Sequence, residues 1–212
     1  MRKMIHDTLV VGLFQCNCSI IGCEETREAI VIDPGDDPER ILEVLERHRL
    51  TVKSILHTHA HFDHIGGTKP LAEVTGARVF LHPEDLFLYE KVGLQAAYFG
   101  LRPPEVGPVD EFLSDEGEIA AGGLRAKVLH TPGHTPGSVC FHLNEGTGII
   151  FTGDTLFRDS IGRTDLWGGS HPMIMQSIHE RLLTLDENTV VYPGHGPATT
   201  IGREREKNPF LR

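Results

Sequence analysis

The sequence predicts an α+β protein in which two β-sheets pack face to face and helices cover their outer faces. Two observations carry this prediction. Short apolar runs bounded by glycine, proline and aspartate recur along the 212 residues, and such runs are typical of strands. Strands come first, helix and strand then alternate, and strands followed by a helix return near the end. This order favours a sandwich of two sheets with helices outside.

The first third of the chain is expected to form a strand pair, a third strand and a helix. Apolar runs at 9–14 and 16–22 are close enough in sequence to form a hairpin or meander, and 29–32 is a third run. Asp33-Pro34-Gly35 is a strong turn signal that ends this strand. Asp37-Pro38 then opens a helix in which apolar residues recur at helical spacing.

The middle of the chain continues the alternation. A buried strand is expected at 52–56 and a helix at 65–74, although Gly66-Gly67 weakens the first turn of that helix. Residues 83–107 are expected to form one or two short helices, which Pro103-Pro104 closes.

The last part returns to strands and ends on helices. The expected strands are 112–113, 126–129, 138–143, 148–152 and 190–192, and the expected helices are 172–183, with Ser170 as N-cap, and a short charged one from Thr199. The chain shows no internal repeat and no low-complexity linker, so a single domain is expected.

The composition limits the partners and the compartment. The formal net charge is −10, whereas binding to phosphates needs clustered lysine and arginine, so nucleic acid is not expected as a partner. No apolar run approaches the roughly 20 residues of a membrane helix, so no membrane partner is expected. Asp7 interrupts the signal-peptide pattern that the basic start Arg2-Lys3 would begin. The four cysteines do not suggest a disulfide scaffold, and a cytoplasmic protein with reduced thiols is expected.

The stretch THAHFDH, residues 58–64, holds three histidines and an aspartate directly after an apolar strand. His59 and His61 are two residues apart, so in extended backbone both side chains point the same way. Asp63 and His64 stand where the chain turns into the next helix. The turn can point these two side chains, as a second pair of ligands, at a neighbouring position. The loop could serve two adjacent metal ions. A hydrogen-bonded histidine cluster is the alternative that this stretch alone leaves open.

Three further segments each place one strong ligand in a glycine-bounded loop beside an apolar strand. LHTPGHTPGS offers His134, IIFTGDTLF offers Asp154 and VVYPGHGP offers His195. Loops at strand ends converge readily, because the sheet fixes them and glycine permits a tight backbone. Together the four segments predict a metal site.

The donors are imidazole and carboxylate only, which suits zinc, iron or manganese and differs from a closed structural cysteine site. Two divalent metal ions are expected, with zinc as the first choice. Two ions ~3.5–4 Å apart can share a hydroxide and polarise a substrate carbonyl. The implied chemistry is attack of metal-bound hydroxide on an electrophilic carbonyl, without a serine or cysteine nucleophile. A complete ligand set favours catalysis over a non-catalytic metal-sensing or scaffolding role.

These segments resemble the metallo-β-lactamase superfamily and, within it, the small glyoxalase II-like hydrolases (hydroxyacylglutathione hydrolases). The resemblance runs from VGLFQCNCSIIG and IVIDPG through THAHFDHIGG, HTPGHTPGS, FTGDTLFRDSIGRTD and YPGHGP to the tail. It implies a four-layer αββα sandwich in a single domain, 1–212, without the C-terminal helical extension of full-length glyoxalase II. It also implies the ligand sets: His59, His61 and His134 for the first metal, Asp63, His64 and His195 for the second, and Asp154 bridging both.

By the same resemblance, the protein is an enzyme that cleaves a small-molecule thioester such as S-lactoylglutathione or a related acyl-thiol. Asp63 is then a ligand and also a proton acceptor. Arg163 stands in GRTD where glyoxalase II enzymes have a lysine, and two roles are open for it: holding the glutathione carboxylate, or a salt bridge to Asp165 or Asp159. Trp167, the only tryptophan, lies in the glycine-rich TDLWGGSH and is a candidate wall of the substrate site.

The main alternative of the same fold is persulfide dioxygenase, an oxidoreductase that also carries a GRTD segment. It binds a single iron through two histidines and one aspartate, whose equivalents here would be His59, His134 and Asp154. The usual dioxygenase stretch resembles RGCGRTDF, whereas this chain reads RDSIGRTDLWGG, which favours the hydrolase. A lactonase of acyl-homoserine lactones shares the ligand set and has less support.

Several neighbouring residues have a structural role as their default interpretation. His57 and His130 adjoin ligand loops and are expected to be core histidines rather than groups that orient a ligand. Asp33 is expected to fix the turn after its strand. Cys16 and Cys18 are expected to serve packing, with a reactive thiol pair as the alternative. The aromatic stretch at 89–99 is also expected to serve packing, with a pocket wall as the alternative.

Overall fold

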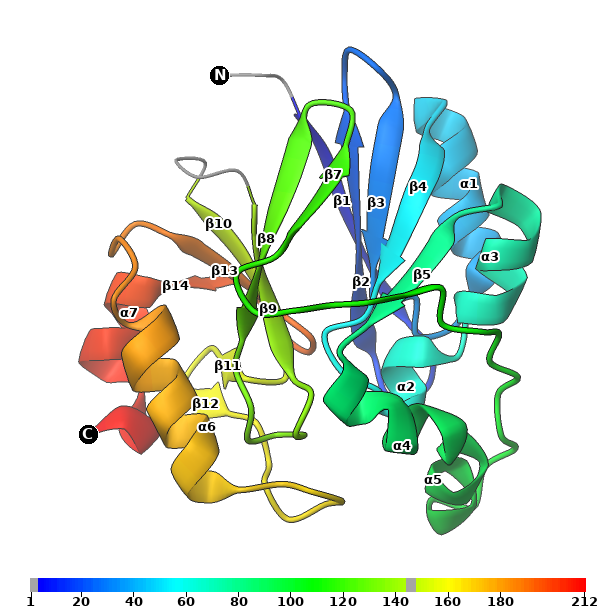
Figure 1. Ribbon diagram of the computed structural model, residues 1–212. Helices are drawn as coiled ribbons and strands as arrows, with labels where there is room; N and C mark the ends of the chain where they lie inside the picture. The colour runs from blue at the N-terminus through cyan, green and yellow to red at the C-terminus, as the bar shows by residue number, and fades with distance from the viewer. Residues whose placement is uncertain (1–3, 144–147) are drawn as a thin grey trace.

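Two six-stranded sheets face each other in the computed structural model, which describes residues 4–143 and 148–212 (Figure 1). Arg2 and Lys3, the basic start of the chain, lie outside the described residues. Helices cover the outer face of each sheet, on the right of the view for the N-terminal half and on the left for the C-terminal half. The expected αββα sandwich is therefore confirmed.

The N-terminal half builds the first sheet, in which the strand order follows the sequence. Its strands are β1 (Met4–Val11), β2 (Cys16–Cys23), β3 (Glu28–Ile32), β4 (Thr51–Leu56), β5 (Arg78–Leu81) and β6 (Glu111–Phe112). The first three strands pair antiparallel, and the pairs from β3 to β6 are parallel. The parallel strands bring their carboxyl ends to one edge of the sheet, which is where open α/β sheets place ligand sites.

The C-terminal half builds the second sheet in the order β14-β13-β10-β9-β8-β7. Its strands are β7 (Glu118–Ala121), β8 (Leu124–His130), β9 (Val139–Leu143), β10 (Ile149–Gly153), β13 (Val190–Pro193) and β14 (Thr199–Thr200), and a separate small pair is formed by β11 (Leu156–Phe157) and β12 (Ser160–Ile161). Only β10 and β13 pair parallel among these strands of the described chain, so the segments after both strands leave the sheet at the same edge.

The helices fall into three groups. The first sheet is covered by α1 (Pro38–His48) and α3 (Thr68–Thr75), and the second by α6 (His171–Ser177), its π-helical continuation Ile178–Leu182, and α7 (Ile201–Lys207). The short helices α2 (Phe62–Ile65), α4 (Leu86–Glu90) and α5 (Val92–Tyr98) lie together at the lower edge in Figure 1. Short 3₁₀ turns are Pro83–Asp85 and Pro209–Leu211. None of the helices in residues 4–143 and 148–212 has the length and apolar character needed to span a bilayer.

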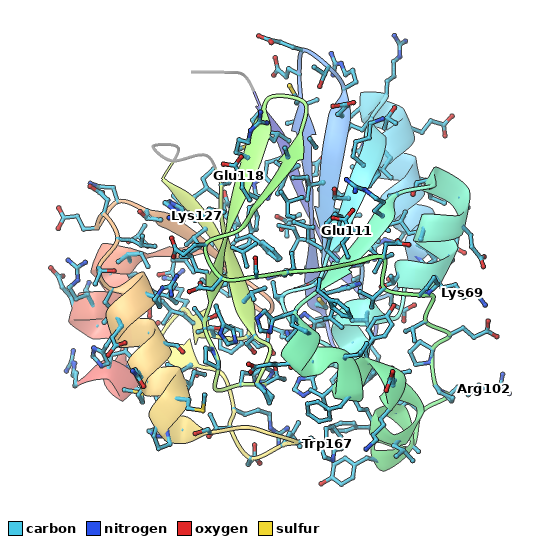
Figure 2. All side chains as sticks on the ribbon, viewed as in Figure 1. Lys69, Arg102, Glu111, Glu118, Lys127 and Trp167 are labelled. Carbon is cyan, nitrogen blue, oxygen red and sulfur yellow. The ribbon has the colours of Figure 1, made fainter. Side chains whose placement is uncertain are left out.

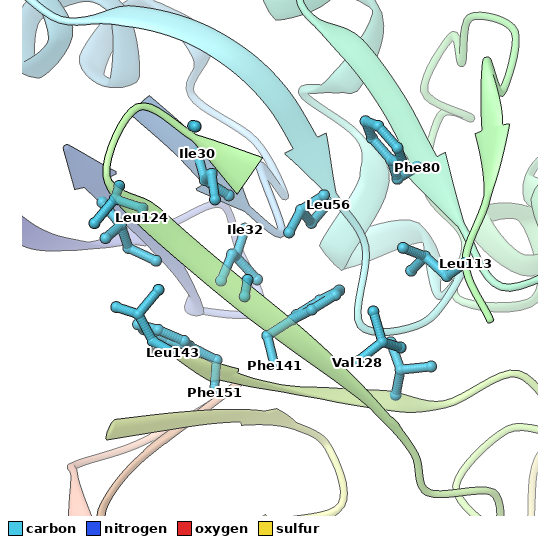
Figure 3. Close-up of a cluster of buried hydrophobic side chains, with 14 of the residues drawn as sticks. Ile30, Ile32, Leu56, Phe80, Leu113, Leu124, Val128, Phe141, Leu143 and Phe151 are labelled. Carbon is cyan, nitrogen blue, oxygen red and sulfur yellow. The ribbon is translucent and has the colours of Figure 1, made fainter. Parts of the chain in front are cut away.

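The main hydrophobic core lies between the sheets (Figure 3). Ile30, Ile32 and Leu56 of the first sheet meet Phe141 and Phe151 of the second. Side chains alternate across a strand, so the opposite faces of the same strands pack against the outer helices. Close packing on both faces fixes the strands, and with them the loops at their ends.

One expected helix is divided in two. The helix expected at 65–74 is α2 followed by α3, with Gly66 and Gly67 between them. A Cβ at Gly66 would lie 2.4 Å from the carbonyl oxygen of Gly35, and one at Gly67 would lie 2.6 Å from that of Pro34. The Gly67 N–H donates to the Pro34 carbonyl at 2.7 Å. The glycines therefore let the turn after β3 dock directly on the segment that carries the ligand candidates.

Other differences from expectation are local. The sequence patterns do not predict β5, β7 or the short strands β11, β12 and β14; β7 reads EIAA and is mostly exposed, so it lacks the residues that mark a strand. Ser170 is the N-cap residue of α6, as expected, although its side chain makes no capping hydrogen bond. The remaining expected strands and helices are present, with ends that differ by a few residues.

Candidate metal centre

Four segments carry the ligand candidates to the edge of the sandwich. The candidates are His59 and His61 after β4, Asp63 and His64 in α2, His134 between β8 and β9, Asp154 after β10, and His195 after β13. Their donor atoms lie within a few ångström of one another, in the two groups of three that the family resemblance implies, with Asp154 between them. All of the predicted ligand residues are therefore brought together.

The first set consists of His59, His61 and His134. The Nε2 atom of His59 lies 3.1 Å from Nδ1 of His61, and Nε2 of His134 lies 3.2 Å and 2.9 Å from these two atoms. A neutral imidazole carries one N–H, so three nitrogens this close cannot all be joined by hydrogen bonds. Zinc–nitrogen bonds of about 2.0–2.1 Å would separate two nitrogens of a tetrahedral site by roughly 3.3 Å. The triangle fits one metal ion.

Acceptors behind the rings direct the lone pairs of this set inward. Nδ1 of His134 donates to the backbone carbonyl of Arg163 at 2.8 Å, and Nδ1 of His59 donates to Oγ1 of Thr58 at 3.1 Å. The Thr58 hydroxyl gives its own proton to Asp33 Oδ2 at 2.6 Å, so it can only accept from His59. Nε2 of both histidines is consequently unprotonated, as a metal ligand must be.

The second set consists of Asp63, His64 and His195. The two histidine Nε2 atoms are 3.1 Å apart, and Oδ2 of Asp63 lies 3.8 Å from that of His64 and 3.4 Å from that of His195. Nδ1 of His64 donates to Asp33 at 3.0 Å, and Nδ1 of His195 donates to the carbonyl of Gln15 at 3.2 Å. Two lone pairs therefore face each other beside a carboxylate, an arrangement that a cation stabilises.

Asp154 lies between the two sets. Its Oδ2 is 3.6 Å from Nε2 of His134 and 3.7 Å from Nε2 of His195, and its Oδ1 is 3.5 Å from Nε2 of His64. Among the described residues, no hydrogen-bond donor reaches the buried Oδ1. A Cβ at Gly194 would lie 2.3 Å from this oxygen, so glycine is required there to leave it room. An unpartnered buried carboxylate oxygen is costly, and a bridging position between two metal ions would satisfy it.

The charges of the two sets differ. Burial lowers the pKa of His59 and of His61 well below the usual value, which keeps both rings neutral. Burial raises the pKa of Asp63, but His64 and His195 outweigh it and hold that pKa below the usual range, so the group is a carboxylate at neutral pH. His59 and His61 of the first set are thus neutral, whereas Asp63 gives the second set a negatively charged ligand candidate.

A buried aspartate ties two ligand loops together, and no sequence motif marks it. Oδ2 of Asp85 accepts from the N–H of Ala60 at 2.9 Å and from Oγ1 of Thr135 at 2.8 Å, and Oδ1 accepts from the N–H of Gly137 at 2.7 Å. Ala60 lies between the first two histidine candidates, and Thr135 follows the third. Asp85 is fully buried, and burial raises its pKa against these hydrogen bonds. Asp85 therefore fixes the loop of His59 and His61 relative to the loop of His134.

Asp33 has a wider role than the expected turn. Its φ of 51° belongs to the turn after β3, as expected. Its Oδ1 also accepts the N–H of Thr58 at 2.8 Å, and its Oδ2 orients His64 and Thr58. Its oxygens are occupied by these bonds, so it lies behind the ligands rather than among them.

A cavity of about 250 Å³ opens over both sets. Trp167 forms part of its wall, as expected, with its ring centroid 6.3 Å from that of His61. Figure 2 shows Trp167 at the tip of the loop before α6, next to α5. Arg163 also lines the cavity, but its Nε and Nη2 bind the two oxygens of Asp165 at 2.7 Å and 2.9 Å. Of the roles left open for Arg163, the structure shows this salt bridge.

The aromatic stretch at 89–99 divides into two parts. Tyr89 and Val92 pack in the core, as expected. Gln95 and Phe99 instead line the cavity, which agrees with the alternative interpretation of this stretch as a pocket wall. Gln95 lies in α5 and Phe99 directly follows it. The sequence does not show that these two residues border the site; the position of α2 in the fold does.

The remaining residues near the ligand loops keep mostly structural roles. His57 is buried with Nε2 3.1 Å from Thr68 Oγ1, and burial lowers its pKa to about 4, as befits a neutral core histidine. His130 stacks on His82 and does not contact a ligand candidate. Cys16 is buried, as expected, and its Sγ lies 3.5 Å from Nδ1 of His64.

Comparisons with known proteins agree with this geometry. Residues 11–195 match the family described as the metallo-beta-lactamase superfamily. Hydroxyacylglutathione hydrolase GloC of Haemophilus influenzae is 39% identical over 207 residues, which are 97% of each chain. The crystal structure of BLEG-1 B3 metallo-beta-lactamase superposes with a TM-score of 0.91 at 39% identity, covering 98% of this chain and 99% of that one. The structure of TTHA1623 in a di-iron-bound form gives 0.88 at 43% identity, covering 97% and 100%.

An αββα sandwich with histidine and aspartate clusters at its open edge is a fold built around metal ions. The chain belongs to the metallo-β-lactamase superfamily.

Proposed function

We propose that the protein is a binuclear metal-dependent hydrolase of small-molecule thioesters. The observation that carries the proposal is the convergence of inward lone pairs and carboxylates from both sheets on two adjacent points, with Asp154 between them. The name of the Haemophilus influenzae relative, hydroxyacylglutathione hydrolase, supports an acylated thiol such as S-lactoylglutathione as substrate.

The donor set decides which residues would hold the metals. His59, His61 and His134 would bind the first ion, Asp63, His64 and His195 the second, and Asp154 both. Zinc is the proposed ion, and iron or manganese suits the same donors; the di-iron form of a relative supports iron as an alternative. When bound, two such ions polarise a carbonyl and lower the pKa of water.

The reaction adds water to the thioester carbonyl carbon and breaks its bond to sulfur, which yields a carboxylic acid and a thiol. The Asp63 carboxylate lines the cavity and is 16% exposed, so in this proposal it accepts the proton of the attacking water and passes it to solvent. A thiolate leaves readily, so no separate general acid is required. Phe62, Phe99 and Trp167 line the cavity over the ligand candidates, so a thioester bound there would be partly shielded from water.

The test is turnover of S-lactoylglutathione by protein loaded separately with zinc and with iron, while oxygen uptake on glutathione persulfide is recorded in parallel. Thioester hydrolysis without oxygen uptake is the expected result. Oxygen uptake with iron alone would reject the hydrolase and support the mononuclear dioxygenase, whose ligands would be His59, His134 and Asp154.

A further inference from the structure

The cavity over the ligand candidates has an aromatic wall. Phe14 from the β1–β2 turn, Phe62 from α2 and Phe99 after α5 contact one another, with ring centroids 5.1, 5.5 and 5.4 Å apart. Leu166 and Trp167 complete the lining on the side of the α6 loop. Separate segments of the chain therefore supply one continuous apolar wall that faces the reaction centre.

The other polar side chains of this cavity are already committed. Gln95 is 2% exposed; its amide nitrogen donates to two backbone carbonyls at 2.9 Å and 2.8 Å, and its oxygen accepts the N–H of Phe62 at 3.2 Å. The charge of Arg163 is balanced by Asp165. Away from the ligands and the exposed guanidinium of Arg163, a substrate hydroxyl would lose its water here without gaining a partner, whereas a hydrocarbon group has no hydrogen bond to lose.

A second cavity of about 280 Å³ adjoins the first and has charged lining. It shares Phe14, Phe62 and Asp63 with the aromatic cavity, so one molecule can occupy both. Asp36 and Arg102 line it, and both are exposed. Within the described chain, Arg102 makes no ion pair, and Figure 2 shows it on the segment after α5.

We infer that the substrates are thioesters with an apolar acyl group and a charged thiol portion. The acyl group lies in the aromatic cavity, the thioester carbonyl lies beside Asp63, and a carboxylate of the thiol portion lies beside Arg102. This orientation follows because only the second cavity offers an unpaired cation. The inference rests on the proposed thioesterase function and narrows its substrate class: a lactoyl group is small and carries a hydroxyl, so it fits the aromatic cavity less well than a longer hydrocarbon.

Chain length is the most direct test. Glutathione thioesters of lactate, acetate, butyrate, hexanoate and phenylacetate would be compared on the metal-loaded full chain. Burial of each methylene favours binding about fourfold, so kcat/KM is expected to rise by up to that factor per methylene until the cavity is full. Hexanoyl and phenylacetyl thioesters should exceed the lactoyl thioester at least tenfold.

Matched variants then test the contribution of each cavity to substrate preference separately. Phe99→Ala should cut kcat/KM for the hexanoyl thioester at least tenfold and leave the acetyl thioester within about threefold. Phe210→Ala is its control, because Phe210 is 51% exposed near the C-terminus. Arg102→Ala should raise KM for glutathione thioesters about tenfold and leave the uncharged N-acetylcysteamine thioester unchanged. Arg47→Ala, on the exposed face of α1, is the control for lost charge.

Each outcome has one meaning. Preference for lactoyl or acetyl groups in the parent protein would overturn the inference and leave the thioesterase standing. If Arg102→Ala raised KM equally for the glutathione thioesters and for the uncharged N-acetylcysteamine thioester, the placement of the thiol portion would be overturned. Hydrolysis of none of these thioesters, with zinc or with iron, would reject the proposed function and the inference with it.

Discussion

Two clusters of histidines lie at the same end of the molecule, and they have opposite geometry. In the set of His59, His61 and His134, the rings stand at 82–88° to one another and three nitrogens converge on one point. His82 and His130 instead stack with centroids 4.2 Å apart and an interplanar angle of 16°. A metal ion binds in the plane of an imidazole ring, so two parallel planes cannot both reach it.

The difference lies in what stands behind each ring. Nδ1 of His59 and of His134 donates to a fixed acceptor, which leaves Nε2 free to bind. In the stacked pair, Nε2 of His130 donates to the carbonyl of Pro136 at 2.9 Å, and the exposed Glu84 lies 4.0 Å from the same nitrogen. The number of nearby histidines therefore does not define a metal site; the acceptors that orient them do.

The largest expected effect is that of Asp63→Ala on the converging cluster. The change removes a carboxylate from the second set, so this variant should retain one metal ion and lose more than about 100-fold in hydrolysis. Metal content by mass spectrometry and turnover on the same sample measure both. Glu43→Ala, on the exposed face of α1, is the control. Full activity with a single ion in Asp63→Ala would reject the binuclear assignment.

Asp85→Asn tests whether orienting groups matter beyond the ligands. An asparagine oxygen cannot replace both carboxylate oxygens, so one ligand loop is released, and the first set should lose 10–100-fold in metal affinity. Competition with a chromophoric chelator measures the affinity. Activity should return at excess metal, because the ligands themselves are intact; a loss that excess metal does not restore would contradict a positioning role.

The stacked cluster of His82 and His130 is expected to affect the stability of the fold at acid pH rather than metal binding. Burial, with help from the neighbouring His130, lowers the pKa of His82 to about 4, below the unfolded value of 6.5. The stability it contributes is full above pH 6.5 and is lost as the pH falls towards 4, because the unfolded chain binds the proton first. His82→Gln should reduce this pH dependence by on the order of 1 kcal/mol, since solvent screens the partly buried ring. Urea unfolding of metal-free protein across this range measures it, and an unchanged slope would contradict the assignment.

The smallest effect is expected for His130→Gln on metal content. The donor atoms of His82, Glu84 and His130 lie within 4.8 Å of one another, but the stacked rings cannot both bind one ion in their planes, so parent and variant should both bind two ions per chain. A third ion in the parent that disappears in the variant would contradict the distinction between the clusters.

The sequence predicts the ligand candidates well because each lies in a short segment with glycine on its flank. Asp85 escapes such reasoning, since its partners at Ala60 and Gly137 come from distant parts of the chain. Gly66-Gly67 predicts a weak helix turn, but the full break follows from contact with the β3 turn. Phe99 is apolar and suits packing equally well, so only the assembled fold identifies it as a wall.

The ligand candidates come from both sheets, four after β4 and three from loops of the second sheet. Bound ions would therefore act as a non-covalent cross-link between the two halves of the chain. Binding to the folded chain alone adds stability by mass action, and this gain rises with the free concentration of metal. Metal limitation in a cell would therefore have two effects: it would stop the chemistry, and it would lower the stability of the metal-free fold, which increases its proteolysis.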